Sequence, residues 1–151
     1  MKAIINKKVL HNYFILEKIE VGVSLSGAEV KSVRAGSVSL TDGFVRITNG
    51  EAGLYNVYIA PYKLALDPSY DPKRTRKLLL HKKEIDYLLG KLTSANLTIV
   101  PTKVYITRNL VKVEIALAKS KRKVDKREVL KRKTVQRETE SLLRQDKRIA
   151  Q

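Results

Sequence analysis

Residues 119–151 limit most strongly how this 151-residue chain can fold. They hold 13 Lys and Arg residues against 5 Asp and Glu residues, and no aromatic residue. Their large apolar side chains are too few to bury enough surface to offset the entropy that folding removes. We therefore predict one compact domain at residues 1–118, followed by a basic tail at residues 119–151. We expect the tail to be disordered when free and helical when an anionic partner neutralises its charge.

The net charge of the chain indicates a polyanionic partner. The whole sequence carries a formal net charge of +16 at pH 7. Such an excess favours nucleic acid first and an anionic membrane surface second. The tail lacks the Trp, Phe and Leu face that membrane-surface helices use, so we expect no membrane partner. The chain has no cysteine, which excludes disulfides and thiolate zinc sites and is compatible with a cytoplasmic location.

Short strands separated by turn residues dominate the sequence before the tail. Asn49-Gly50 is a typical turn of a β-hairpin, Arg108-Asn109 marks a second tight turn, and residues 61–76 read as a loop. Many antiparallel strands with few helices predict a mainly β fold, a small β-barrel with two or three short helices. The expected strands are 13–21, 44–48, 54–59, 97–107 and 110–118.

Two helices are marked by the residues at their ends. Ser26 and Glu29 match a capping box, in which each side chain satisfies the backbone amide of the other residue, and they predict a helix over 29–34. Gly36 suits the left-handed residue that follows such a helix. A second helix is expected to start near His81. The Glu29 carboxylate could equally accept hydrogen bonds from the edge of a nucleic-acid base, so both roles stay open.

The sequence contains no recognisable catalytic motif. Its two histidines, His11 and His81, have no carboxylate or nucleophile at a motif spacing, and there is no phosphate-binding glycine loop. We therefore expect a protein that is not an enzyme and that uses no cofactor and no metal.

Cations surround the start of the second predicted helix. Arg74, Arg76 and Lys77 precede it, and Lys82-Lys83 opens it. In a chain this basic, contact with phosphate explains them better than a merely solvated face does. Six tyrosines offer rings on which unpaired bases could stack, although aromatic residues in strands commonly pack in the core. They are Tyr13, Tyr55, Tyr58, Tyr62, Tyr70 and Tyr105.

Several segments of the chain resemble one known family. Residues 26–36, SGAEVKSVRAG, resemble the GTEVKSLRAG-type segment of the SsrA-binding protein family, also called small protein B. The segments NYFI, DGFVRI, IAPY, DPKRTRKLLLH and DKR occur in the order that the family shows, and together they span essentially the whole chain. No single segment is decisive, but their order and spacing make the resemblance specific.

The resemblance implies a six-stranded, OB-like antiparallel β-barrel with flanking helices. It also implies an adaptor that binds tmRNA (SsrA RNA) and delivers it to stalled ribosomes in trans-translation, so that they are rescued and the nascent peptide is tagged. In this family the barrel grips the tRNA-like domain, and the tail enters the decoding centre and mRNA path of the ribosome. Alanyl-tRNA synthetase and elongation factor Tu act on the same RNA. We expect a monomer that acts in the cytoplasm.

The resemblance places Glu29 on the helix carboxylate that the family uses at its RNA interface. Charge and position beside the family segments add five expected RNA contacts, namely Asn12, Arg34, Arg76, Lys77 and Lys82. The expected ribosome-binding residues of the tail lie in and around the DKR motif, namely Lys121, Arg122, Lys123, Asp125, Lys126, Arg127, Lys131, Arg132 and Lys133.

Three positions depart from the family pattern. Val124 stands where an aromatic residue or histidine usually precedes the DKR motif, so this position lacks a ring that could stack on ribosomal bases. Tyr70 stands in place of a common histidine, and Gly53 stands where a larger apolar residue is frequent. None of the three alters the charge pattern of the chain.

Two other functions fit the composition. A structural ribosomal protein would be a barrel anchored permanently in ribosomal RNA by its basic extension, and it would be found on every ribosome. A peripheral membrane protein would instead use the basic tail on anionic lipid, but the missing apolar face disfavours it.

Overall fold

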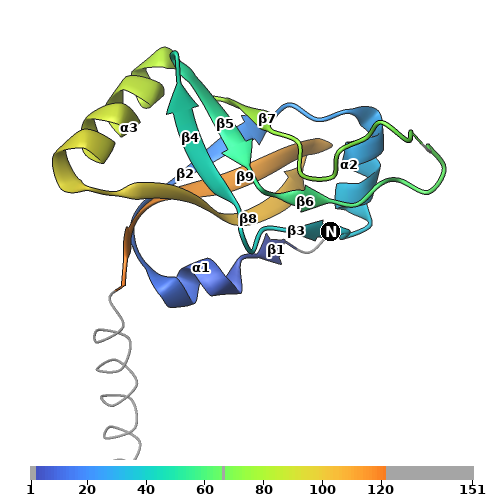
Figure 1. Cartoon of the computed structure of the whole chain (residues 1–151), viewed down its shortest axis with the longest axis horizontal. Helices are drawn as coiled ribbons and strands as arrows, with labels where there is room; N and C mark the ends of the chain where they lie inside the picture. The colour runs from blue at the N-terminus through green and yellow to red at the C-terminus, as the bar shows by residue number, and fades with distance from the viewer. Residues whose placement is uncertain (1–2, 66, 122–151) are drawn as a thin grey trace, which may run out of the picture. The chain divides into compact units, whose positions relative to one another are not determined.

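The computed structural model of the chain describes residues 3–65 and 67–121 (Figure 1). The predicted disorder of the tail and its helix on binding lie outside the described residues. The same holds for its expected ribosome-binding residues from Arg122 onward, and only Lys121 of that set is described.

The compact domain, called the head from here on, ends where the last strand ends. The chain divides into two units, Met1–Ser120 and Lys121–Gln151. The last strand runs to Ser120, so Lys119 and Ser120 pair within the head, whereas we predicted them in the tail.

The described residues form nine strands and three helices. None of these helices has the length and apolar character that a membrane span requires. The strands are β1 (Ile4–Ile5), β2 (Tyr13–Val23), β3 (Val38–Ser39), β4 (Phe44–Thr48), β5 (Glu51–Tyr55), β6 (Tyr58–Ile59), β7 (Arg76–Leu79), β8 (Thr98–Thr107) and β9 (Leu110–Ser120). The helices are α1 (Lys7–Asn12), α2 (Gly27–Arg34) and α3 (Lys82–Ala95).

Six of the strands close into an antiparallel barrel. Within the described residues the pairing order is β8-β4-β5-β7-β2-β9, and β9 pairs back to β8 to complete the ring. The short strand β1 pairs with β8 outside this ring, and β3 and β6 form a separate two-stranded sheet. This topology confirms the prediction of a small, mainly β barrel with short helices.

The long strands β2, β8 and β9 form the most extensively paired wall of the barrel. The pairing of β2 with β9 extends from Tyr13 opposite Ser120 to Gly22 opposite Lys112. The turn between β8 and β9 contains Arg108 with φ of 52° and Asn109 with φ of 63°. Two positive φ angles suit a tight hairpin turn whose twist matches its strands, so the predicted second turn is confirmed.

The core lies inside the barrel and under the helices at its ends. The inward side chains of β9, Val111, Val113, Ile115 and Leu117, are all buried, as the alternation in the sequence predicted. Leu88 of α3 is 1% exposed, and α2 contributes Val33 to the same core. Figure 1 shows α3 and α2 at opposite ends of the barrel.

Two predicted segments differ from the structure by more than the position of an end. The expected strand over 54–59 is split into β5 and β6, because Asn56 between them has a left-handed φ of 60°. Strand β7 occupies residues that we assigned to a loop and to the approach of the second helix. That helix itself begins directly after His81, as predicted.

Helix α1 was not predicted, and one buried side chain fixes it. Asn6 caps the helix, since its Oδ1 accepts from the amide of Val9 at 3.2 Å. Its Nδ2 donates to the carbonyl oxygens of Leu40 at 2.8 Å and Pro101 at 3.0 Å. Asn6 is 3% exposed, so one buried amide joins α1, the start of the β3–β4 turn and β8.

We predict that Asn6→Ala lowers the free energy of unfolding by about 2–4 kcal/mol, because it removes a helix cap and two buried hydrogen bonds to the carbonyls of Leu40 and Pro101. Urea denaturation followed by circular dichroism measures this loss. Asn96, which ends α3 with a φ of 51°, provides the control. Asn96→Gly should change stability by less than about 0.5 kcal/mol, since glycine accepts that conformation. An equal loss in both variants would contradict this role for Asn6.

Candidate RNA interface

Helix α2 begins with the capping box that the sequence predicts. The Ser26 hydroxyl accepts from the amide of Glu29 at 3.2 Å, and Glu29 Oε1 accepts from the amide of Ser26 at 3.0 Å. The helix starts two residues earlier than predicted, at Gly27, and Gly36 after it has a φ of 79°. The capping role of Glu29 is therefore confirmed, and its backbone places the carboxylate at the N-terminal end of α2.

The Glu29 carboxylate also lies at the centre of a buried ionic network. It is 1% exposed. Arg74 Nε donates to both carboxylate oxygens, at 3.1 and 3.2 Å, and Arg74 Nη2 donates to Oε1. Arg76 Nε donates to Oε2 at 2.7 Å. One carboxylate thus binds two guanidinium groups, so its buried negative charge has two counter-charges.

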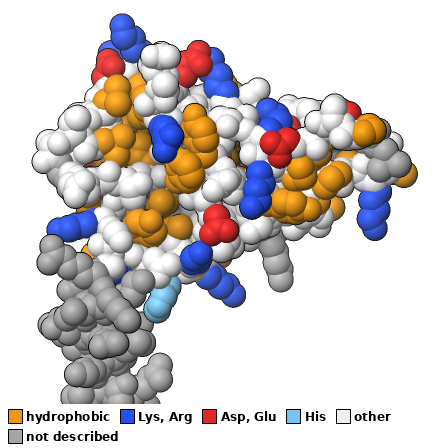
Figure 2. All heavy atoms as spheres, in the orientation of Figure 1, with side chains coloured by type: hydrophobic (Ala, Val, Ile, Leu, Met, Phe, Trp, Pro, Cys, Tyr) orange, Lys and Arg blue, Asp and Glu red, His pale blue; other side chains and the backbone are white. Residues whose placement is uncertain are grey.

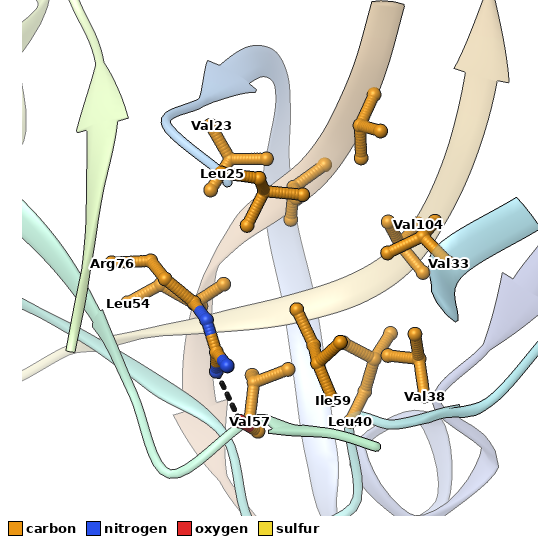
Figure 3. Close-up of a pocket in the computed structure, with 12 residues that line it drawn as sticks. Val23, Leu25, Val33, Val38, Leu40, Leu54, Val57, Ile59, Arg76 and Val104 are labelled. Carbon is orange, nitrogen blue, oxygen red and sulfur yellow. Dashed lines mark hydrogen bonds between the residues drawn. The ribbon is translucent and has the colours of Figure 1, made fainter. Parts of the chain in front are cut away.

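Arg76 is fully buried although it carries a charge. Its Nη1 donates to the Val57 carbonyl at 2.6 Å, and its Nη2 donates to the Pro72 carbonyl at 2.9 Å and to the Tyr70 hydroxyl at 3.0 Å. Figure 3 shows the guanidinium directed toward Val57 from among apolar side chains that line the barrel interior. Fully buried arginine is rare, and it persists here because every side of the group has a partner.

The network determines the charge state of the Glu29 carboxyl group. Burial by itself would raise its pKa, but hydrogen bonds from Arg74, from the Ser26 amide and from Arg76 outweigh that effect and lower the pKa to about 2. Burial and the neighbouring Glu29 charge raise the pKa of Tyr70, whose hydroxyl lies 2.8 Å from the Ile59 carbonyl. Glu29 is therefore ionised in the folded protein at neutral pH.

The network joins three separate parts of the chain. Glu29 lies on α2, Tyr70 and Arg74 lie in the loop before β7, and Arg76 lies on β7 itself. A cavity of about 260 Å³ lies beside it, lined by α2 residues and by Tyr62 and Asp67 of the loop. The loop after β6 is therefore held against α2, and Arg74, whose side chain is 39% exposed, is fixed at the surface of that junction.

The structure separates the predicted RNA contacts into two groups. Glu29 and Arg76 meet in the buried network. The others lie apart on different elements: Asn12 ends α1, Arg34 ends α2, Lys77 lies on β7 and Lys82 opens α3. Arg34, Lys77 and Lys82 are exposed, and Asn12 is half-buried.

The tyrosines singled out in the sequence have different surroundings. Tyr55 stacks on Phe44, with ring centroids 5.3 Å apart, and Lys31 lies over the Tyr62 ring. Tyr105 donates to Glu20, and burial together with that carboxylate raises the pKa of Tyr105 to about 12. Tyr58 is 39% exposed. Tyr13 packs beside the small core cluster under α1.

An exposed apolar patch was missed by the sequence reasoning. Leu79 of β7 is 58% exposed and Leu110 of β9 is 59% exposed. With Gly22 and Lys112 they line a cavity of about 260 Å³. Residues alternate between buried and exposed along β7, where Arg76 and Leu78 are buried and Lys77 and Leu79 are exposed. This alternation predicts an exposed Leu79, but only if residues 76–79 are first recognised as a strand.

We predict that the stability of the protein falls as the pH drops from about 5 to 2, in part through Glu29. Its folded pKa of about 2 lies below the ordinary value of 4.5, so its contribution is complete above pH 4.5 and lost as the pH falls through 2. Glu29→Gln should cost about 3–5 kcal/mol at pH 7, since it leaves two guanidinium groups without a counter-charge.

Urea denaturation at pH 7 and pH 3 tests this prediction. The stability difference between wild type and Glu29→Gln should shrink by about 2 kcal/mol at the lower pH. Glu51→Gln is the control, because Glu51 makes only an exposed ion pair with Lys77 at 3.5 Å. A difference that does not depend on pH would show that the ionic network does not stabilise the fold.

Comparisons with known proteins agree with this architecture. The family model described as SmpB protein matches residues 3–145. An SsrA-binding protein of Persephonella marina is 58% identical over 133 residues, which is 88% of each chain. An SsrA-binding protein of Enterococcus faecalis is 50% identical over 143 residues, 95% of this chain and 93% of that protein.

A solved structure shares the fold as well as the sequence. The chain in the structure called "tmRNA-SmpB: a journey to the center of the bacterial ribosome" superimposes with a TM-score of 0.68 at 46% identity. The match covers 85% of this chain and 94% of that one. The family model spans the head and most of the tail, and the relatives align over nearly their full lengths, so this chain belongs to the SmpB family of SsrA-binding proteins.

Proposed function

We propose that this protein is the tmRNA-binding adaptor of trans-translation, which delivers tmRNA to stalled ribosomes so that they are rescued and the nascent peptide is tagged. The observation that carries the proposal is the family match from residue 3 to residue 145, which includes both the barrel and most of the basic tail. The protein catalyses no reaction of its own in this role. It acts by binding two RNA assemblies with two different parts of one chain.

The barrel is the part that we propose binds the tRNA-like domain of tmRNA. Exposed cations on three elements, Arg34, Lys77 and Lys82, supply phosphate contacts, and Asn12 supplies a polar contact. Glu29 and Arg76 are buried, so we propose that they position the interface instead of touching RNA. They hold the loop and Arg74 in place, which lowers the ordering cost of binding.

The tail is the part that we propose enters the ribosome, at the decoding centre and along the mRNA path. Its excess of Lys and Arg suits a channel lined by RNA phosphates. Alanyl-tRNA synthetase and elongation factor Tu are partners through the tmRNA that they share with this protein. Because ribosomes are the target, we place the protein in the cytoplasm, as a monomer on each tmRNA.

We predict that truncation after Lys121 leaves tmRNA binding nearly intact and abolishes peptide tagging. The cut spares β9, whose pairs Tyr13 with Ser120 and Phe14 with Lys119 would be lost in a shorter protein. Affinity for tmRNA should fall by less than about tenfold at physiological salt, since screening limits the long-range effect of the tail charge. Gel shift with tmRNA and a reconstituted tagging reaction measure the two activities.

The control for the truncation is a tail of the same composition in scrambled order. It should bind tmRNA like the wild type and fail in tagging, which separates sequence from bulk charge. Parallel loss of both activities on truncation would contradict the division of labour. Presence of the protein on every ribosome after high-salt washing would instead indicate a structural ribosomal protein.

We predict that Arg34→Gln and Lys82→Gln each weaken binding to tmRNA, whatever the base sequence of the RNA, and reduce the dependence of the affinity on salt concentration. Each lost phosphate contact should lower the slope of log affinity against log salt by about 0.7–0.9. Titrations between low and physiological salt give the slope. Lys91→Gln on the exposed face of α3 is the matched control, and a slope change equal to that of the control would remove Arg34 or Lys82 from the interface.

A further inference from the structure

Three neighbouring strands carry a cation, a glycine and a cation in one row on the outside of the barrel. The register pairs Arg46 of β4 with Gly53 of β5, and Gly53 with Lys77 of β7. Val45, Leu54 and Leu78, which are neighbours of these three residues along their strands, are buried in the core. Because successive side chains of a strand point to opposite faces, Arg46 and Lys77 both stand on the outer face, with only a hydrogen atom between them at Gly53.

The missing side chain leaves a hollow beside Lys77. A cavity of about 340 Å³ lies there, lined by Thr48, Glu51, Gly53, Tyr55, Thr75 and Lys77 among others. A Cβ atom placed on Gly53 would lie 3.0 Å from Tyr55 Cε2 and 3.2 Å from Thr75 Cγ2. The floor of the hollow is therefore backbone, and even one methyl group would crowd its walls.

Tyr55, which lines the hollow, belongs to an ordered aromatic stack with Phe44. Phe44 and Tyr55 are directly opposite in the β4–β5 register, and their rings lie 7° from parallel. The Arg46 guanidinium lies 5.4 Å from the Phe44 centroid and 5.6 Å from the Tyr55 centroid. Figure 2 shows hydrophobic side chains gathered over β4 with a Lys or Arg side chain among them. The stack holds the planar guanidinium beside the hollow before any ligand arrives.

We propose that this hollow binds one unpaired nucleotide of an RNA. The base would lie in this cavity against the Tyr55 ring, since unpaired bases stack on aromatic rings. The flanking phosphates would contact Arg46 and Lys77. The proposal deepens the RNA-binding function proposed above and rests on it for the identity of the RNA.

The acid beside the hollow does not exclude a phosphate. Glu51 pairs with Lys77 at 3.5 Å, but the two side chains are 68% and 58% exposed. An exposed pair of this kind contributes little to stability, so Lys77 can exchange Glu51 for a phosphate at small cost. Double-stranded RNA presents its bases stacked and paired, so a hollow one residue wide suits a nucleotide from a loop or a bulge.

Two RNAs test the proposal: the tRNA-like domain of tmRNA, and an oligouridine of about ten nucleotides, long enough for one binding groove. Each carries one 4-thiouridine for photocrosslinking. We expect a crosslink to a peptide that contains Phe44 or Tyr55. Gly53→Leu, which fills the hollow, should weaken oligouridine binding by about 5- to 150-fold, the range that the loss of one base stack produces.

A second variant keeps the test valid if Gly53→Leu fails to fold. The double variant Arg46→Gln, Lys77→Gln removes both charges beside the hollow and keeps side chains of similar length. The matched control is Lys7→Gln, Lys91→Gln, which removes two exposed charges from α1 and α3. The Arg46→Gln, Lys77→Gln double variant should lose more affinity for oligouridine than the control double variant does, and it should give no crosslink to Tyr55. Equal affinities for the two pairs, or crosslinks confined to other strands, would overturn the proposal.

The outcomes also separate this proposal from the adaptor function. If wild type binds the tRNA-like domain tightly and the variants of the hollow match the control, the hollow is not a nucleotide site and Lys77 is not an RNA contact, but the adaptor function stands on the remaining contacts. If wild type fails to bind the tRNA-like domain, the adaptor function fails, and the oligouridine crosslink alone decides whether the hollow binds a nucleotide.

Discussion

The ionic contact between Glu29 and two arginines is the interaction on which the junction of α2, the loop before β7 and β7 itself depends. The carboxylate caps α2, holds Arg74 of the loop and accepts from Arg76 inside the barrel. A buried carboxylate with two guanidinium partners is expensive to desolvate, and the fold retains it only because each donor and acceptor is satisfied. Removing Glu29 alone leaves Arg76 buried without its counter-charge, whereas replacing the whole network by apolar side chains is compatible with a stable core. The loss common to both changes is the attachment of the loop to α2, so the network specifies the arrangement of these elements.

Asn6 has a similar role beside α1, where one neutral amide makes the contacts that the charged carboxylate of Glu29 makes at α2. Asn6 caps α1 and also ties it to two carbonyls from distant segments. Both residues are the buried polar caps of short helices. A helix of six or eight residues is unstable alone, so each depends on a cap that is simultaneously a tertiary contact. Helices α1 and α2 are thus attached to the barrel through their first turns.

Local signals in the sequence predicted those elements whose causes are local. The Ser26 capping box, the Asn49-Gly50 turn and the alternation from Val111 to Leu117 depend on residues within a few positions of one another, and each is confirmed. Helix α1 and strand β7 were missed for the opposite reason. The cap of α1 is secured by Leu40 and Pro101, and β7 carries a buried arginine whose partner, Glu29, is 47 residues away. Sequence reasoning treated Arg76 as a surface cation, because nothing near it in the chain reveals the carboxylate that allows its burial.

The pairing at the end of β9 gives the head a mechanical property. The last residues before the tail are hydrogen-bonded to the first residues of β2, and farther along β9 lies between β2 and β8. A force applied to the chain beyond Lys121 and directed along β9 would load that strand in shear. The hydrogen bonds of β9 to β2 and to β8 would then resist the force together. The head should therefore remain folded under tension that would peel away a strand attached at the edge of a sheet.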